Sequence, residues 1–220
     1  VNFGDISYTN YDELTYADQA QFEGKLVVYA EGIYQGYKYY ETRYEDVVLG
    51  RYGADDPVGS TDGEAWTYAD EVIYPFGHGL SYSDFSQTLN DVTYDAASGE
   101  YVASVTVKNE SGMPGKHVVH LYAQTPYGDY ERANLVEKSA IQLAGFAKTG
   151  ELAEGESETV EVRVDEYLLA SYDYTNLKGY YLSGGDYYFA IGDNVHDALN
   201  NVPAAKAAAG VQVNAAAMTA

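Results

Sequence analysis

The stretch YPFGHGLSYSDF, from Tyr74 to Phe85, separates two regions of the chain that differ in character. It contains a proline, two glycines spaced Gly77-x-Gly79, and aromatic residues on both sides of them. Glycines in this arrangement favour a turn in which the backbone takes a positive φ or closely approaches a neighbouring segment. Flanking aromatic rings are typical of a packed turn. We therefore predict a hinge here, with the rings of Phe76 and Tyr82 packed against the region that follows.

Apolar and polar residues alternate in several segments after the hinge, at 101–108, 119–124, 160–164 and 187–191. A period of two with one apolar face predicts half-buried antiparallel strands. Clusters of turn-forming residues lie between these segments, at 110–115, 126–129 and 153–157. Several short strands at this spacing favour a β-sandwich. Within the first turn, Asn109-Glu110-Ser111 has the form of a glycosylation sequon, but we interpret it as part of the turn.

The region before the hinge is polar, acidic and rich in tyrosine, without a sustained period over residues 1–24. We expect a short helix at 12–21, a short apolar strand at 26–30, and a helical tyrosine face between Ile33 and Arg43. Lys38 and Arg43 are the cations of this segment, and we expect them to pair with neighbouring carboxylates.

Two further segments have no expected role in a core. Residues 50–70 have the turn content of a long acidic loop, and their spacing does not match a calcium-binding loop. Residues 196–220 are rich in alanine and show no apolar face that would dock, apart from a helical turn before Pro203. We therefore expect this tail to fray or to act as a linker.

Composition excludes several classes of function. The 220 residues have a net charge of −22, which repels nucleic acid and anionic membrane surfaces but does not penalise a neutral partner such as a sugar. The absence of cysteine excludes disulfides and thiolate metal sites. No segment approaches a membrane span, and Val1 does not open a signal peptide. These features suit a bacterial protein, cytoplasmic or secreted.

Five segments, in this order, resemble signatures of glycoside hydrolase family 3, the β-glucosidase-type enzymes. They are EGIYQGYKYYETR (Glu31–Arg43), PFGHGLSYSDF of the hinge, SVTVKNESGMPGKHVVHLYAQTP (Ser104–Pro126), LAGFAKTGELAEGESETVEVRV (Leu143–Val164) and GDYYFAIGDN (Gly185–Asn194). The resemblance implies a mainly β fold: an immunoglobulin or fibronectin-III-like β-sandwich preceded by a loop-rich α/β remnant. It implies the end of the family's α/β sandwich domain at 1–85, the fibronectin-III-like domain at 86–195, and an alanine-rich tail or linker at 196–220.

The resemblance also implies that the catalytic groups lie elsewhere. The family's nucleophile is an aspartate of a (β/α)8 barrel, and the motif that carries it does not occur in this chain. The family's acid/base glutamate lies upstream of the EGIY-like motif, in a region that is mostly absent here. We assign no catalytic, cofactor-binding or metal-binding residue. Glu31 lies in a matched motif, but we favour a structural carboxylate that bonds loop amides or the nearby cations. His117 and His120 are three apart on a predicted strand, so their side chains should point to opposite faces and not share a metal.

The sequence therefore predicts a non-catalytic scaffold portion of a family 3 glycoside hydrolase, whose full enzyme hydrolyses terminal β-glycosidic bonds. Its partners would be the missing catalytic (β/α)8 barrel and the rest of the α/β sandwich domain. Two alternatives stay open: a free-standing carbohydrate-binding module, and one chain of a split family 3 enzyme. Tyrosine-rich loops without their partner would expose apolar rings, which makes a homodimer a further expectation.

Overall fold

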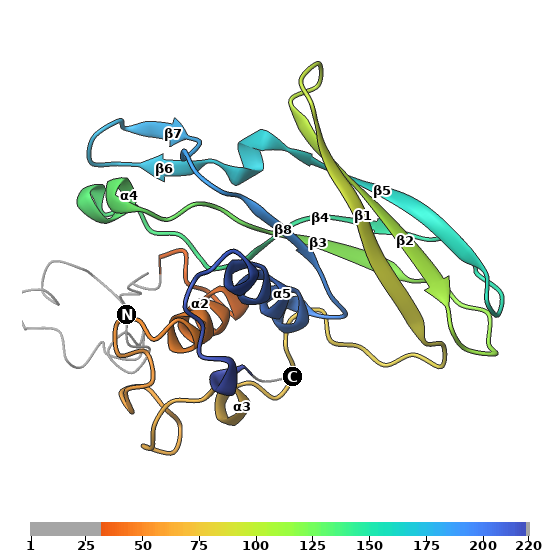
Figure 1. Cartoon of the computed structure of the whole chain (residues 1–220), viewed down its shortest axis with the longest axis horizontal. Helices are drawn as coiled ribbons and strands as arrows, with labels where there is room; N and C mark the ends of the chain where they lie inside the picture. Colours follow the sequence, from red (N-terminus) through yellow and green to blue (C-terminus); the bar gives the residue numbers. More distant parts are fainter. Residues whose placement is uncertain (1–31, 219–220) are drawn as a thin grey trace, which may run out of the picture.

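The computed structural model describes residues 32–218, and a β-sandwich forms its larger part (Figure 1). Two three-stranded antiparallel sheets make up this sandwich. The first has the order β1 (Phe85–Asp95), β2 (Glu100–Asn109), β5 (Ser157–Asp165), and the second β4 (Gln142–Lys148), β3 (Val118–Gln124), β8 (Tyr188–Ile191). The predicted mainly β sandwich is confirmed.

The sandwich core consists of the alternating residues that the sequence pattern indicated. The fully buried members lie on β2, β3 and β5: Val105, Val107, Val119, Leu121, Val162 and Val164. On β4 the two sheets approach so closely that a Cβ at Gly145 would lie 2.8 Å from Val162 Cγ1. A glycine is therefore required at this position of the core.

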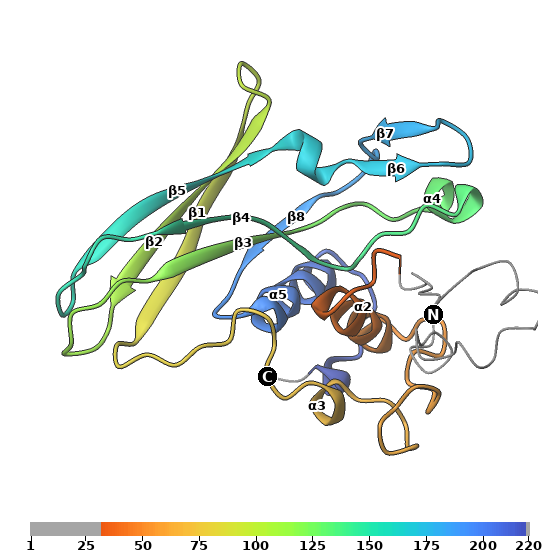
Figure 2. The same cartoon turned by 180° about the vertical axis from the view of Figure 1, so that it is seen from behind.

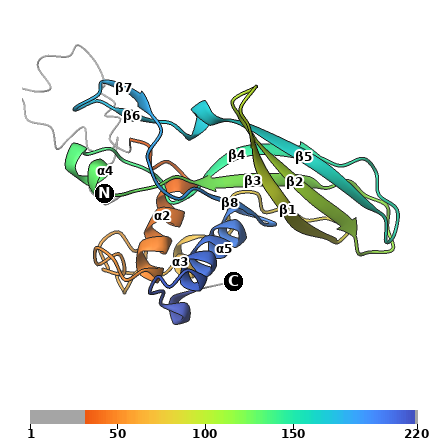
Figure 3. The same ribbon diagram turned by 45° about the horizontal axis from the view of Figure 1, so that its top comes forward.

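Between β5 and β8 the chain leaves the sandwich and forms a small hairpin. A 3-10 turn, η3 (Glu166–Leu169), leads into the hairpin strands β6 (Ser171–Asp173) and β7 (Gly179–Tyr181). The hairpin lies beside the short helix α4 (Asp129–Asn134), as Figure 3 shows. Tyr130 of α4 donates a hydrogen bond of 2.6 Å to Asp173 Oδ2 on the hairpin.

A layer of helices covers the outer face of the β4–β3–β8 sheet (Figure 2). It consists of α2 (Tyr37–Val48), α3 (Tyr68–Glu71), α5 (Val195–Ala208) and the 3-10 turn η4 (Ala215–Ala217). A second core lies between this layer and the sheet. Its most buried members include Tyr44, Val48, Trp66, Tyr122, Ile141 and Leu199.

Helix α5 corrects the expectation for the tail. The prediction that residues 196–220 fray or act as a linker is wrong over Val195–Ala208, which form a helix of 14 residues. Its buried residues Val195, Ala198, Leu199 and Val202 have the spacing i, i+3, i+4, i+7 of an apolar helix stripe. Asn194 caps the helix by accepting a 3.0 Å hydrogen bond from Asp197 N.

The hinge has the predicted backbone but not all of the predicted packing. Gly77 has a φ of 91°, and a Cβ there would lie 3.3 Å from Asn194 Cα, so close approach requires glycine. Gly79 has no positive φ. The expectation that the rings of Phe76 and Tyr82 pack against the sandwich is wrong for Tyr82, which is 92% exposed. Phe76 is 42% exposed; its ring stacks on Tyr37 with centroids 4.8 Å apart and reaches the sandwich at His120 of β3, 6.4 Å away.

Candidate functional site

Helix α2 places the carboxylate of Glu41 in the interior of the protein. Glu41 has no solvent exposure; its carboxylate accepts 2.5 Å from Tyr68 Oη and lies 3.0 Å from His196 Nδ1. The Tyr68 and His196 rings stack with centroids 3.7 Å apart. Burial and the neighbouring Glu41 raise the pKa of Tyr68, so its hydroxyl stays protonated and donates. This cluster joins α2, α3 and α5, and we refer to it as the Glu41 cluster.

Arg43 orders the acidic loop that follows α2. Its guanidinium donates to the carbonyl oxygens of Ala54, Asp56 and Val58 over 2.6–3.0 Å. It also lies 4.8 Å from the centroid of the Trp66 ring. The expected pairing with local carboxylates is wrong, since neither Lys38 nor Arg43 forms an ion pair within residues 32–218.

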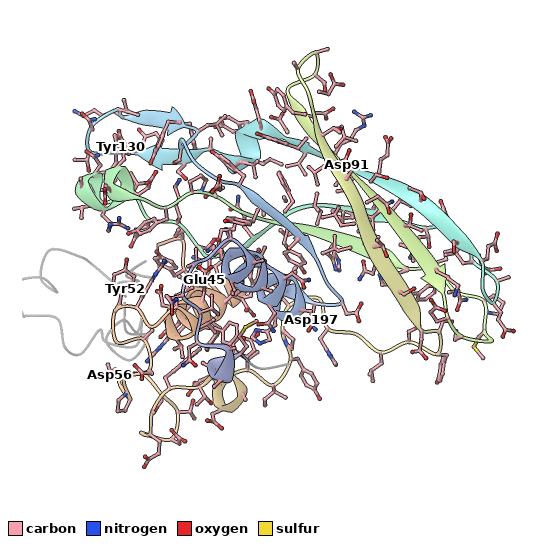
Figure 4. The ribbon with its side chains drawn as sticks, viewed as in Figure 1. Glu45, Tyr52, Asp56, Asp91, Tyr130 and Asp197 are labelled. Carbon is pink, nitrogen blue, oxygen red and sulfur yellow. The ribbon has the colours of Figure 1, made fainter. Side chains whose placement is uncertain are left out.

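Two adjoining cavities lie against the polar side of α2. Their volumes are about 520 and 580 Å³. Both are lined by the same four residues, Tyr34, Thr42, Asp46 and Tyr52, and we call the combined space the Asp46 groove. One end reaches the loop ordered by Arg43, and the other reaches Tyr127, Tyr188 and Lys206. Figure 4 labels Tyr52 and Glu45 in this part of the molecule.

The carboxylate of Asp46 is the unusual group of the groove. Burial, followed by repulsion from Glu45, raises the pKa of Asp46 to about 7, although Arg51 and Lys206 oppose the shift. Within residues 32–218 its carboxylate takes part in no hydrogen bond or ion pair. Glu45 differs, because it accepts 2.6 Å from Lys206 Nζ and 2.9 Å from Gln124 Nε2. Asp46 is therefore a half-buried acceptor that faces a cavity.

A second buried charge pair has a structural role. Lys138 Nζ donates 2.6 Å to the Pro126 carbonyl, contacts Ser183 Oγ, and lies 3.3 Å from Glu131 Oε1. Burial would raise the pKa of Glu131, but hydrogen bonds from Ser183 and Gly128 and the charge of Lys138 lower it to about 2. Burial lowers the pKa of Lys138, although Glu131 opposes the shift. All of these groups have partners, so the pair fixes α4 and its loops rather than offering a reactive atom.

The remaining candidates do not assemble into a catalytic or metal site. His117 packs against Phe85 at 5.1 Å, and His120 lies 6.4 Å from Phe76. Within residues 32–218 no group of three His, Cys, Asp or Glu side chains is arranged to hold a metal ion. None of the described helices has the length and apolarity to cross a membrane. Glu31 lies outside the described residues.

Sequence reasoning missed Asp46 and the Glu41 cluster. Asp46 and Glu41 lie in YYETRYEDVV, where the acidic residues resemble a solvated helix face, and the other members of the cluster, Tyr68 and His196, lie far away in the sequence. Only the packing of α2 against α5 distinguishes Glu41, which is enclosed, from Asp46, which faces the groove. The one local signal is the i, i+4 spacing of Glu41 and Glu45 beside the aromatic positions of the same helix.

Comparison with known proteins accounts for most of the chain. Residues 117–195 match the family model "Fibronectin type III-like domain". Beta-glucosidase A of Butyrivibrio fibrisolvens is 34% identical over 189 residues, which cover 78% of this chain and 19% of that protein. Beta-glucosidase of Ruminococcus albus is 30% identical over 193 residues, covering 86% of this chain and 17% of that protein. The chain thus spans under a fifth of the length of these curated relatives.

Solved structures of beta-glucosidases have a similar fold over most of this chain. A beta-glucosidase from Paenibacillus barengoltzii superposes with a TM-score of 0.59 at 30% identity, covering 78% of this chain and 16% of that one. Beta-glucosidase 3B from Thermotoga neapolitana, solved with glucose, has a TM-score of 0.59 at 26% identity and covers 88% of this chain and 21% of that one. The chain therefore belongs to the β-glucosidase-type glycoside hydrolases of family 3, as a portion that includes their fibronectin type III-like domain.

Proposed function

We propose that the chain is a non-catalytic scaffold of a family 3 glycoside hydrolase. In this proposal residues 1–85 are the end of the α/β sandwich domain and residues 86–195 are the fibronectin-III-like domain, with α5 packed between them. The missing barrel and the rest of the α/β sandwich domain would supply the catalytic groups. The full enzyme would hydrolyse terminal β-glycosidic bonds, in keeping with the names of its relatives.

One observation carries the proposal: the second core joins the region before the hinge to the sandwich. Tyr44 and Val48 of α2, Leu199 of α5, and Tyr122 of β3 are all at most 1% exposed within it. Each fully buried side chain of this size contributes about 1.5–3 kcal/mol. A junction with several such residues resists bending, which is the property a brace between domains needs.

The first test concerns activity of the chain alone. The purified chain should unfold cooperatively yet leave p-nitrophenyl β-glucoside, β-xyloside and α-arabinoside intact. Full-length β-glucosidase A from Butyrivibrio fibrisolvens, assayed in parallel, serves as the positive control. Hydrolysis that follows the chain through purification and disappears in Glu31→Gln would overturn the scaffold proposal.

A free-standing carbohydrate-binding module remains the alternative that an observation favours. The β6–β7 hairpin exposes Tyr172, Tyr174 and Tyr180, each 50–61% accessible, and the rings of Tyr172 and Tyr180 lie 5.2 Å apart. Exposed aromatic faces suit stacking on sugar rings. Retention on insoluble cellulose or xylan that is lost in the Tyr172→Ala/Tyr180→Ala double variant would support the module. The scaffold proposal expects no retention.

Two other expectations stay predictions with direct tests. Light scattering of the purified chain decides whether it forms a homodimer. The genes adjacent to its own decide whether it is one chain of a split enzyme, since a barrel on a neighbouring reading frame would supply the missing half.

A further inference from the structure

The Asp46 groove has the size of a ligand site. Its two parts, of about 520 and 580 Å³, each fall in the range typical of small-molecule pockets, about 300–1,000 Å³. Helix α2, the loop at 51–58, the loop at 124–127 and the segment 137–140 form most of its walls. The remaining lining residues are Tyr34, Asp186, Tyr188, Lys206 and Val211. These walls converge on Thr42 and Asp46, which line both parts.

Most polar groups of the groove already have protein partners. Arg43 is bound to loop carbonyls, and Lys206 is bound to Glu45 at 2.6 Å. Thr42 Oγ1 donates 2.6 Å to the Lys38 carbonyl and accepts 2.8 Å from Ala140 N. The carboxylate of Asp46 is different, since it has no hydrogen bond or ion pair within residues 32–218. A half-buried carboxylate without partners costs free energy, which a ligand that donates hydrogen bonds would recover.

Aromatic rings lie open beside this acceptor. Tyr52 is 71% exposed and is held with a φ of 55°, a left-handed backbone that non-glycine residues rarely adopt. Tyr127, 47% exposed, lines the other part of the groove. Strain of this kind tends to occur where a side chain must be held in a particular place. The groove therefore offers the exposed rings of Tyr52 and Tyr127 in addition to the Asp46 carboxylate, with the Arg132 guanidinium 5.7 Å from the centroid of the Tyr127 ring.

The charges that line the groove exclude strongly ionic ligands. Facing Asp46 are Glu45 on its own helix, Arg51 on the next loop and Lys206 on α5. Over the whole groove the acidic side chains are Glu45, Asp46, Asp56, Glu137 and Asp186, and the basic ones are Arg43, Arg51, Lys138 and Lys206. Such near balance attracts neither anions nor cations. A neutral molecule with hydroxyl donors and a C–H face satisfies both the carboxylate and the rings.

We propose that the Asp46 groove binds a neutral saccharide, whose hydroxyls donate to the Asp46 carboxylate and whose ring packs against Tyr52. This binding requires no catalytic group, so it goes beyond the scaffold function and is tested independently of it. The raised pKa of Asp46, about 7, adds a pH signature. Hydrogen bonds to an ionised carboxylate are stronger than those to a neutral acid, so affinity should rise as pH increases from 6 to 8.

The test is titration of the full chain at pH 6 and pH 8, followed by saturation-transfer NMR and calorimetry. The probes are methyl β-D-glucopyranoside, D-xylose and cellobiose, with sodium acetate and methylammonium chloride as charged comparisons. We expect at least one saccharide to bind more tightly at pH 8. Asp46→Asn and Tyr52→Ala should each weaken binding tenfold or more. The control is Asp91→Asn on β1, which lies outside the groove and should leave binding unchanged (Figure 4). Tyr180→Ala on the hairpin distinguishes the groove from the alternative carbohydrate site.

Each contrary outcome overturns the proposal. Binding of no saccharide at pH 8, binding that Asp46→Asn leaves intact, or preferential binding of either charged probe would show that the groove is not a saccharide site. Binding abolished by Tyr180→Ala alone would place the site on the hairpin. Circular dichroism of each variant verifies folding, and the hydrolysis assay described above reports separately on the scaffold proposal.

Discussion

Replacement of His196 by alanine tests the Glu41 cluster, which joins helices α2, α3 and α5 within the helical layer. The substitution removes the ring that stacks on Tyr68 at 3.7 Å and packs at a tilt against Tyr44 at 4.4 Å. It also removes the Nδ1 atom that lies 3.0 Å from Glu41 Oε2. Glu41 has no solvent exposure, so water cannot replace the lost contact without opening the structure.

The expected loss of stability is about 3–5 kcal/mol, because removal of the buried ring leaves a cavity and takes a hydrogen-bond partner from the Glu41 carboxylate. Glu41→Gln should cost less, about 1–2 kcal/mol, because the amide oxygen still accepts from Tyr68, and the amide N–H can donate to His196 Nδ1 once the imidazole changes tautomer. The matched control is His78→Ala. His78 is exposed, and its ring lies 4.9 Å from that of Tyr74, so its replacement should change stability by less than about 0.5 kcal/mol.

The chain provides a probe for this region alone. Trp66 is the single tryptophan, is 2% exposed, and belongs to the second core rather than to the sandwich core. Its fluorescence during urea unfolding therefore reports on the helical layer, whereas far-ultraviolet circular dichroism includes the strands. In His196→Ala the fluorescence transition should move to lower urea and separate from the dichroism transition. A loss below 1 kcal/mol in the fluorescence transition would refute the view that this cluster holds the layer in place.

Three further substitutions test other parts of the structure by urea unfolding. Because burial raises the pKa of Asp46 from 3.8 to about 7, the folded state loses stability as pH rises through this interval. Asp46→Asn should therefore stabilise the chain at pH 8 by about 1–3 kcal/mol and change its stability little near pH 4. Equal effects at both pH values would contradict the assigned pKa. Asn109→Ala should cost about 2–4 kcal/mol, because the Asn109 amide donates to the Met113 and Leu152 carbonyls at 2.8 and 2.9 Å; a loss under 1 kcal/mol would show that water replaces these bonds. Gly145→Ala should cost about 1–3 kcal/mol by overpacking against Val162, and an unchanged midpoint would mean that the sheets separate freely.

The strands were predictable because alternation and burial are coupled in a sandwich. Val105 and Val107 face the core while Ser104 and Thr106 do not, and a one-residue shift would expose the apolar set. The turn at Asn109 was also predictable, since an Asx side chain before Ser and Gly favours a turn. Its side chain is fully buried, and its Oδ1 accepts a 2.9 Å hydrogen bond from Ser111 N, which closes the turn.

The helical layer was less predictable, because its sequence patterns are short and because burial of its residues depends on contacts with segments far away in the sequence. The apolar stripe of α5 extends over only two turns, from Val195 to Val202, before the alanine-rich sequence obscures it. The position of Arg43 beside carboxylates suggested ion pairs, yet the loop after α2 offers it three carbonyls. Contacts between residues about 155 positions apart in the sequence decide which side of α2 packs against α5. No local sequence pattern predicts such contacts.

Strand β3 determines where the helical layer attaches, because the two cores meet on it. Val119, Leu121 and Ala123 point into the sandwich core, whereas Tyr122 points into the second core and Gln124 bonds to Glu45 of α2 at 2.9 Å. The pairing of β3 with β4 shifts between Leu121 and Tyr122, where β4 carries the extra residue Ala144, so the alternation of β3 itself continues unbroken. The register of a single strand thus sets the position of α2 relative to the sandwich, and with it the position of the Asp46 groove. A brace between domains requires this kind of coupling, in which the orientation of the outer layer follows from the core it covers.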